Sequence, residues 1–202
     1  MAGGYDSMNL MAIVIGIIGL VISYKRPIQQ IKQSNTQAIT LSSTMLAMGF
    51  TLLVAMMSGA NPQVTNLMPV LNSPLLTIHV AIVMCSYALF FFIMMLGIAG
   101  LITGRSDQRT LITILLYPAV TLLATGIIVG AVWANISWGN YWSWDPKEVW
   151  ALISLILYAI PLHPTLLRSQ KAFYIYCTLA FFSILITYFG VNLVLGGIHS
   201  YS

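Results

Sequence analysis

Charged residues are scarce in this sequence: Asp, Glu, Lys and Arg together make up only 6% of its 202 residues. Soluble domains carry about 25% charged residues, so a chain this poor in charge needs lipid around most of its surface. The few basic residues behind the net charge of +4 are scattered, which argues against nucleic-acid binding. Hydrophobic residues, at 59%, leave almost no room for a soluble domain.

Cysteine is also rare. Cys85 and Cys177 lie inside apolar runs and form no CxxC pair, which argues against a thiol–disulfide or zinc function. The sequence has no Gly-rich phosphate loop, no HExxH motif and no nucleophile elbow. No cationic region precedes the first apolar run, which starts near Met8, so we expect a retained first span rather than a cleaved signal peptide.

Long apolar runs dominate what remains, and each approaches the roughly 20 residues that cross a bilayer. They predict an all-α, polytopic membrane protein with about six transmembrane helices in a single membrane domain. The expected spans are residues 8–24, 39–58, 74–103, 110–133, 146–163 and 172–195.

The basic residues predict the orientation of these spans. Seven of the eight Lys and Arg residues lie in the connections that follow the first, third and fifth runs. They are Lys25, Arg26, Lys32, Arg105, Arg109, Arg168 and Lys171. The positive-inside rule places these connections in the cytoplasm. We therefore expect both termini, the 59–73 loop and the 134–145 loop on the outer face.

Two helix starts can be identified from local sequence. Asp145 suits an N-cap, Pro146 suits the first helical position, and Glu148 completes a capping-box pattern. Ser73 and Pro74 predict the start of the third span by the same logic. Both starts are expected on the outer face.

All five tryptophans fall in one window, at positions 133, 138, 142, 144 and 150. An aromatic belt would spread them over helix ends on both membrane faces, whereas here a single loop region holds them all. We interpret the cluster as a platform for a large, flat, apolar ligand, because indoles combine broad apolar faces with N–H donors.

The chain has only three histidines, His79, His163 and His199. A lone interfacial histidine is usually a solvated surface residue. His79 opens the third span and His199 follows the sixth, so both are expected on the outer face, level with the tryptophans. Two imidazoles beside an aromatic platform could supply both axial ligands of a haem iron. His163 is expected near the cytoplasmic face, because the 18 residues from Pro146 to His163 span about 27 Å at 1.5 Å per helical residue.

Several other residues admit two readings. Asp145 and Glu148 are explained by capping, and acid–base catalysis is the weaker alternative. Lys147 could meet a haem propionate or be a solvated lysine. Gly126 and Gly130 form a GxxxG pattern, which marks either a close helix-packing face or two chance glycines.

The run from Trp138 to Trp150, WGNYWSWDPKEVW, resembles the tryptophan-rich WWD signature of the cytochrome c assembly haem-handling proteins. It is most similar to the CcsA/ResC branch of the system II cytochrome c synthases. The segment around His79 resembles the one with that family's first external histidine, and the segment around His199 resembles the one with its second. His163 matches the transmembrane histidine that follows the signature. The resemblance covers most of residues 60–202.

The resemblance implies a membrane subunit of a cytochrome c haem lyase, part of a holocytochrome c synthase. Haem b, both substrate and ligand, would be held outside by His79 and His199 and presented for thioether attachment to the CxxCH motif of an apocytochrome c. The other haem-binding positions implied are Trp138, Tyr141, Trp142, Trp144, Asp145 and His163, with no catalytic acid or base. The expected partner is a CcsB/ResB-like protein in the bacterial cytoplasmic (inner) membrane, with the WWD loop (134–150) on the outer side.

Two departures from the family pattern accompany the resemblance. Family members are often longer, and their transmembrane haem site uses two histidines, whereas this chain offers only His163. The second histidine would come from the CcsB/ResB-like partner, or else this site is degenerate. Two other functions stay open: a haem-delivery or export protein that loads a separate haem chaperone, and a haem-free structural subunit or small-solute channel.

Overall fold

The computed structural model describes residues 4–24, 44, 48–49, 73–104 and 106–195, and this part of the chain is helical, without strands. Three of its helices are long and apolar enough to cross a membrane, namely Pro74–Thr103, Asp107–Trp138 and Gln170–Val191. A shorter apolar helix covers Asp6–Val21. The prediction of an all-α polytopic membrane protein is confirmed. The count of six spans stays a prediction, because the expected span 39–58 lies almost wholly outside the described residues.

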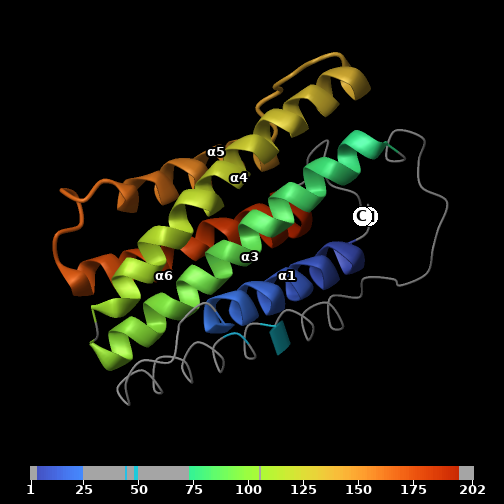
Figure 1. Ribbon diagram of the computed structural model, residues 1–202. Helices are drawn as coiled ribbons and strands as arrows, with labels where there is room; N and C mark the ends of the chain where they lie inside the picture. Colours follow the sequence, from blue (N-terminus) through green and yellow to red (C-terminus); the bar gives the residue numbers. More distant parts are fainter. Residues whose placement is uncertain (1–3, 25–43, 45–47, 50–72, 105, 196–202) are drawn as a thin grey trace.

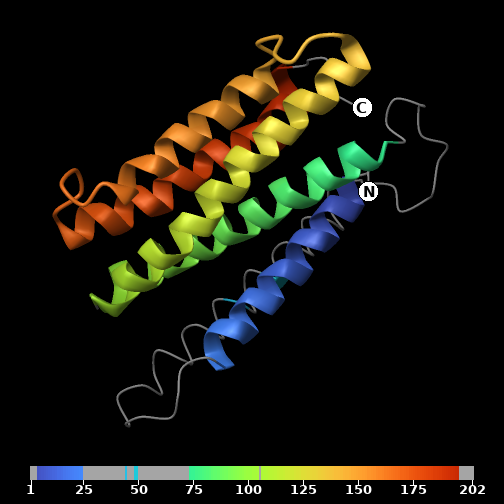
Figure 2. The same cartoon turned by 45° about the horizontal axis from the view of Figure 1, so that its top comes forward.

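Within the described residues, five α-helices form an elongated bundle (Figure 1). They are α1 (Gly4–Tyr24), α3 (Pro74–Thr103), α4 (Asp107–Trp138), α5 (Pro146–Ala159) and α6 (Gln170–Leu185). Helix α3 is central, because α1, α4 and α6 all pack against it, while α5 packs against α4 and α6. Short connections join α3 to α4, α4 to α5 and α5 to α6, so consecutive helices run antiparallel (Figure 2).

Glycines in the left-handed conformation end two of these helices. Gly104 (φ 65°) ends α3, and its N–H donates to the Gly100 carbonyl at 2.9 Å. Gly139 (φ 81°) ends α4, and its N–H donates to the Asn135 carbonyl at 2.9 Å. Helix α4 therefore ends at Gly139, beyond the expected end at residue 133. Glycine suits this position because it adopts a positive φ without steric cost. The connection to α5 is correspondingly short, residues 139–145.

The other helix ends follow local chemistry. Helix α3 begins at Pro74, although the Ser73 side chain makes no capping hydrogen bond. Helix α5 passes into a 3-10 turn, η3 (Ile160–Leu162), which contains Pro161 and is followed by His163. Helix α6 continues as a π-helix, η4 (Ile186–Leu195), whose wider turn the apolar pattern did not predict.

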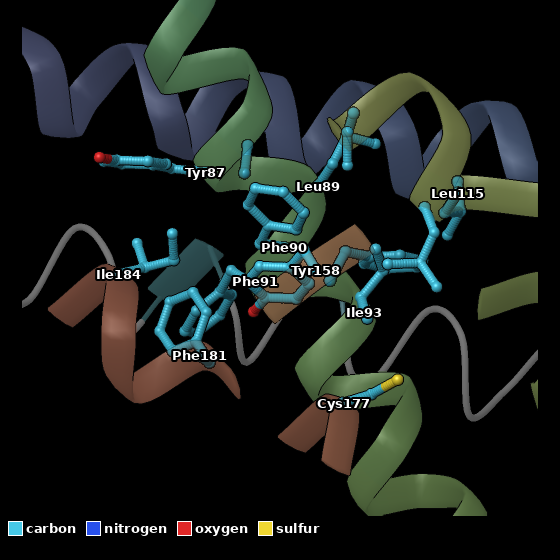
Figure 3. Packing of buried hydrophobic residues seen from close by; sticks show 14 of the residues in the cluster. Tyr87, Leu89, Phe90, Phe91, Ile93, Leu115, Tyr158, Cys177, Phe181 and Ile184 are labelled. Carbon is cyan, nitrogen blue, oxygen red and sulfur yellow. The ribbon is translucent and has the colours of Figure 1, made fainter. Parts of the chain in front are cut away.

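The core surrounds α3 and includes buried residues of α1, α4, α5 and α6 (Figure 3). Phe90 on α3 stacks on Tyr158 of α5, with ring centroids 3.7 Å apart and planes 17° apart. Phe91 meets Phe181 of α6 edge to face at 5.2 Å. These side chains are buried and lock α5 and α6 against the central helix through broad apolar contact.

Hydroxyl groups join the helices inside this apolar bundle. The Ser154 and Ser183 hydroxyl oxygens lie 3.0 Å apart and connect α5 to α6, with the Thr187 hydroxyl 3.5 Å from Ser154. The Ser86 hydroxyl donates to the Ala119 carbonyl at 2.9 Å and connects α3 to α4. Polar contacts of this kind hold helices together where lipid surrounds the bundle.

Large apolar side chains point outward from the bundle. Ile102 is 80% exposed and Ile128 is 65% exposed, on α3 and α4 respectively. Such residues are tolerated where hydrocarbon rather than water covers the surface. The outward-facing isoleucines therefore agree with an integral membrane protein.

The bundle has two distinct ends. We call the end with the start of α3 and the 139–145 connection the tryptophan-loop end, and the opposite end the arginine end. At the arginine end, Arg109 donates from Nη2 to the Leu167 carbonyl at 2.6 Å and from Nη1 to the Arg168 carbonyl at 3.2 Å. Its guanidinium also lies 4.5 Å above the centre of the Phe173 ring. The first turn of α4, which carries Arg109, and the connection from α5 to α6, which carries Arg168, thus lie together.

Candidate functional site

A cavity of about 310 Å³ lies at the tryptophan-loop end. This volume is at the lower end of the roughly 300–1,000 Å³ of ligand sites. Helices α1, α3, α4 and α5, the 139–145 connection and η4 all contribute to its wall. The lining residues are Ser7, Leu76, His79, Val80, Val83, Met84, Tyr87, Leu123, Ile127, Gly130, Ala131, Trp133, Tyr141, Trp142, Lys147, Glu148, Ala151, Thr187 and Tyr188.

His79 is the histidine that this cavity contains. It is half-buried in the second turn of α3, and its Nδ1 lies 2.8 Å from the backbone carbonyl oxygen of Gly126 on α4. A carbonyl oxygen only accepts, so Nδ1 donates and carries the proton. In the neutral ring, Nε2 is then the nitrogen with the lone pair. Metal-binding histidines characteristically hold their second ring nitrogen on a carbonyl or carboxylate in this way.

The two glycines of the GxxxG pattern face α3 at this point. A Cβ on Gly126 would lie 2.6 Å from Val83 Cγ2, and a Cβ on Gly130 would lie 2.6 Å from Cε1 of His79. Side chains at either position would meet α3, so the close-packing interpretation of the pattern is correct. The histidine ring lies where the Gly130 side chain would otherwise be.

The tryptophan-bearing connection is held by a capping box, as predicted. The Asp145 carboxylate accepts from the Lys147 N–H at 3.1 Å. The Glu148 carboxylate accepts from the Asp145 N–H at 3.2 Å and from the Ser143 N–H at 2.9 Å. Two carboxylates are thus engaged with backbone amides, which fixes the loop onto the first turn of α5.

The tryptophans do not form one continuous surface. Trp142 lines the cavity, whereas Trp144 is 71% exposed and meets Trp142 edge to face, at 5.9 Å and 88°. Trp144 also has a φ of 58°, which is uncommon for a residue with a side chain. Trp138 packs edge to face on Trp133 at 4.8 Å. The indoles therefore divide into a cavity-facing group, Trp133 and Trp142, and others around it.

The predicted site residues fall into three groups. His79, Tyr141 and Trp142 line the cavity, while Trp138, Trp144 and Asp145 adjoin it without being part of its described lining. His163 is exposed at the arginine end, where its backbone N–H donates to the Ile160 carbonyl at 3.0 Å. His199 lies outside the described residues, so the expected pairing of His79 with His199 stays a prediction.

Several lining residues were not among the predicted haem-binding positions, although Trp133 belongs to the predicted tryptophan cluster. Trp133 shares one face of α4 with Gly126 and Gly130, because positions 126, 130 and 133 follow helical spacing. That periodicity was available in the sequence. Thr187 and Tyr188 come from the π-helix η4, and no sequence signal pointed to them.

Lys147 is the one lysine or arginine in the described lining of the cavity. It occupies the first turn of α5, next to Glu148, whose carboxylate is already engaged by two backbone N–H groups. The cavity wall thus combines aromatic and aliphatic surface with one imidazole and one ammonium group. This composition suits a flat apolar ligand that carries an acidic group.

Together these features define a polytopic α-helical membrane protein whose aromatic, histidine-containing cavity lies at one end of the bundle. A family profile described as "Cytochrome C assembly protein" matches residues 1–199. The chain belongs to this cytochrome c assembly family, in agreement with the resemblance of its tryptophan-rich motif.

Individual relatives support this assignment. The chain is similar to "Cytochrome c biogenesis protein CcsA" of Trachelium caeruleum, with 32% identity across 98% of this chain and 75% of that protein. It is 37% identical to a CcsA of Prochlorococcus marinus, across 68% of this chain and 57% of that protein. "Protein NrfI" of Wolinella succinogenes is 41% identical across 80% of this chain, but the match spans only 20% of that protein. The chain thus covers a fifth to three quarters of these relatives.

Proposed function

We propose that the chain is the membrane subunit of a cytochrome c haem lyase, with the tryptophan-loop end on the outer face of a bacterial cytoplasmic membrane. There it would bind haem b in the cavity and present it for attachment to apocytochrome c. Membership of the cytochrome c assembly family supports this role. The arginine end would face the cytoplasm, in keeping with the positive-inside rule.

One observation carries the proposal. His79 is fixed by its Nδ1 hydrogen bond to Gly126 and lies in a wall that also holds Trp133 and Trp142. An imidazole with a fixed tautomer is a suitable axial ligand for haem iron, and the indoles offer apolar faces for the macrocycle. The second axial ligand is proposed to be His199.

The attachment reaction requires positioning more than acid–base catalysis. Each cysteine thiol of a CxxCH motif adds across a haem vinyl group: a C–S bond and a C–H bond form, while the S–H bond and the vinyl π-bond break. No net oxidation or reduction of the two reactants occurs. The carboxylates of Asp145 and Glu148 are occupied in the capping box, so we assign them a structural role and the cavity an orienting role.

A CcsB/ResB-like membrane protein is the proposed partner. His163 lies exposed at the arginine end, beyond the C-terminal end of α5, whereas the cavity is lined by the start of that helix. In the proposed complex it pairs with a partner histidine to bind haem on its way through the membrane. His163→Ala should therefore reduce haem loading in cells that contain the partner and leave the spectrum of already loaded protein nearly unchanged. Normal loading in such cells would contradict this role.

Reconstitution with the partner tests the main proposal. The chain, a CcsB/ResB-like protein and an apocytochrome c are produced together, and covalently bound haem on the cytochrome is measured after denaturing electrophoresis. We expect attachment with the wild-type chain and little with His79→Gly, with partial recovery on adding imidazole. Attachment that is indifferent to His79→Gly would refute the proposed site.

The alternative function makes a different prediction in the same preparation. A haem-delivery protein would co-purify with a small haem chaperone and ATPase subunits and would load that chaperone without any CcsB/ResB-like protein. A haem-free structural subunit or channel would show no haem absorption under any of these conditions. Either result would replace the lyase proposal.

A further inference from the structure

We propose that Gly126 and Gly130 form a seat for the His79 imidazole and that Gly130 is a positioning residue for haem ligation. The inference rests on the proposed function, because it assigns the His79 ring its role as a ligand. It adds a reason why α4 must carry two glycines at these positions. Neither glycine is expected to touch haem iron.

The two glycines perform different tasks. Gly126 lets the backbones of α3 and α4 approach, because a Cβ there would come within 2.6 Å of Val83 Cγ2. That approach brings the Gly126 carbonyl oxygen to 2.8 Å from His79 Nδ1. Gly126 thus supplies the acceptor that fixes the tautomer and one edge of the ring.

Gly130 supplies the space for the ring itself. A Cβ at this position would lie 2.6 Å from His79 Cε1, 2.8 Å from Nδ1 and 3.4 Å from Nε2. Contacts this short cannot be accepted without movement, and the atoms concerned belong to a stiff aromatic ring. The imidazole would have to swing away from α4, which would break its hydrogen bond to the Gly126 carbonyl.

The orientation of the ring determines where Nε2 points. With Nδ1 held on α4, rotation about the side-chain torsions of His79 is restricted, so Nε2 keeps one direction. Loss of a hydrogen-bond partner that orients a metal ligand typically costs about 10- to 100-fold in metal affinity. We expect a displaced ring to cost haem affinity to the same degree.

The substitution Gly130→Ala tests the seat, and Gly100→Ala is its matched control. A Cβ on Gly100 would lie 2.7 Å from the Tyr174 ring, so the same methyl group is added against an aromatic side chain outside the cavity. Haem affinity and the absorption spectrum of the reduced protein are measured for both variants, purified in detergent. We expect Gly130→Ala to weaken haem binding about 10- to 100-fold, with recovery on adding imidazole, and Gly100→Ala to leave ligation unchanged.

A thermal double-mutant cycle on haem-free protein tests the seat independently of ligation. Gly130→Ala should lower Tm in the wild-type background and much less in the His79→Gly background, where no ring occupies the space. Additive losses of Tm in the two backgrounds would contradict the proposal that Gly130 accommodates the ring. The proposal would also be contradicted if Gly130→Ala kept the wild-type haem spectrum while His79→Gly lost haem. If His79→Gly itself leaves haem binding intact, the proposed function fails, and the thermal cycle still decides whether the glycines seat the ring.

Discussion

Tight glycine contacts occur along the central helix toward both ends of the bundle, and they accommodate different partners. Near the arginine end, Gly97 and Gly100 of α3 lie against Thr178 and Tyr174 of α6. Near the tryptophan-loop end, α4 presents its glycines to α3, and one of them faces the imidazole of His79. The same residue type closes the bundle in one region and shapes a cavity wall in the other.

The comparison extends to charge. Arg109 at the arginine end uses its guanidinium on two backbone carbonyls and on the Phe173 ring, which are structural contacts. Lys147 at the tryptophan-loop end instead forms part of the cavity wall. The arginine end therefore contributes contacts to the fold, whereas we propose that the tryptophan-loop end binds the ligand. Substitutions at the two ends should separate stability from haem binding.

The largest effect on haem binding is expected from His79→Gly. Removing the imidazole takes away the proposed axial ligand, so the loss should exceed the roughly 10- to 100-fold that removal of a ligand's hydrogen-bond partner costs. The reduced wild-type protein should show a low-spin, six-coordinate spectrum, and added imidazole should restore much of it in the variant. His199→Gly is the companion variant. A spectrum unaffected by both changes would mean that the ligands are elsewhere.

The next effect concerns packing and should leave haem untouched. Gly100→Ala places a methyl group against Tyr174, and overpacking of this kind typically destabilises by about 1–3 kcal/mol. Thermal unfolding in detergent should show a lower Tm, while the haem spectrum of the folded fraction stays that of the wild type. A changed spectrum would show that the two ends are not independent.

A smaller loss is expected from Arg109→Gln. The variant loses charge-assisted hydrogen bonds to two carbonyls, which we expect to cost about 1–2 kcal/mol at this partly buried position. Arg168→Gln is the control, because Arg168 contributes only its backbone carbonyl to this contact and the substitution keeps that group. The free energy of unfolding measures both. Equal losses in the two variants would contradict the role assigned to the Arg109 guanidinium.

The smallest effect distinguishes two neighbouring indoles. Trp142 lines the cavity and Trp144 is mostly exposed, so Trp142→Ala should weaken haem retention more than Trp144→Ala. Aromatic contacts are worth about 0.5–1.5 kcal/mol beyond buried area, which corresponds to a change of about 2- to 12-fold in Kd. The ligation type should not change in either variant. A larger loss in Trp144→Ala would show that haem contacts the outer indole.

The sequence predicted most of the local structure at these ends. Apolar runs indicated the all-α membrane fold, and the Asp145–Glu148 spacing predicted the capping box that the structure contains. These features depend on residues close together in the chain. The family was also recognisable, because the tryptophan-rich motif is one continuous segment.

The remaining features depend on the backbone conformation of single residues and on neighbours in space. The apolar run predicted that the fourth span ends at residue 133. Helix α4 instead continues to Trp138, because the residue that ends it is Gly139, which has a left-handed backbone conformation. Trp144 combines a positive φ with an exposed side chain, and the tryptophan-rich motif indicated neither. The contact between Gly130 and the His79 ring depends on the packing of α3 against α4, because the two residues are distant in sequence.

The wall of the cavity has a consequence for biogenesis. Ser7 belongs to the first described helix, whereas Thr187 and Tyr188 belong to the last. A nascent chain lacks this side of the enclosure until the segment that carries Thr187 and Tyr188 has been made and inserted. If haem binds in the cavity as we propose, its capture requires that this segment is already in place, so bound haem would mark chains in which η4 has joined the bundle.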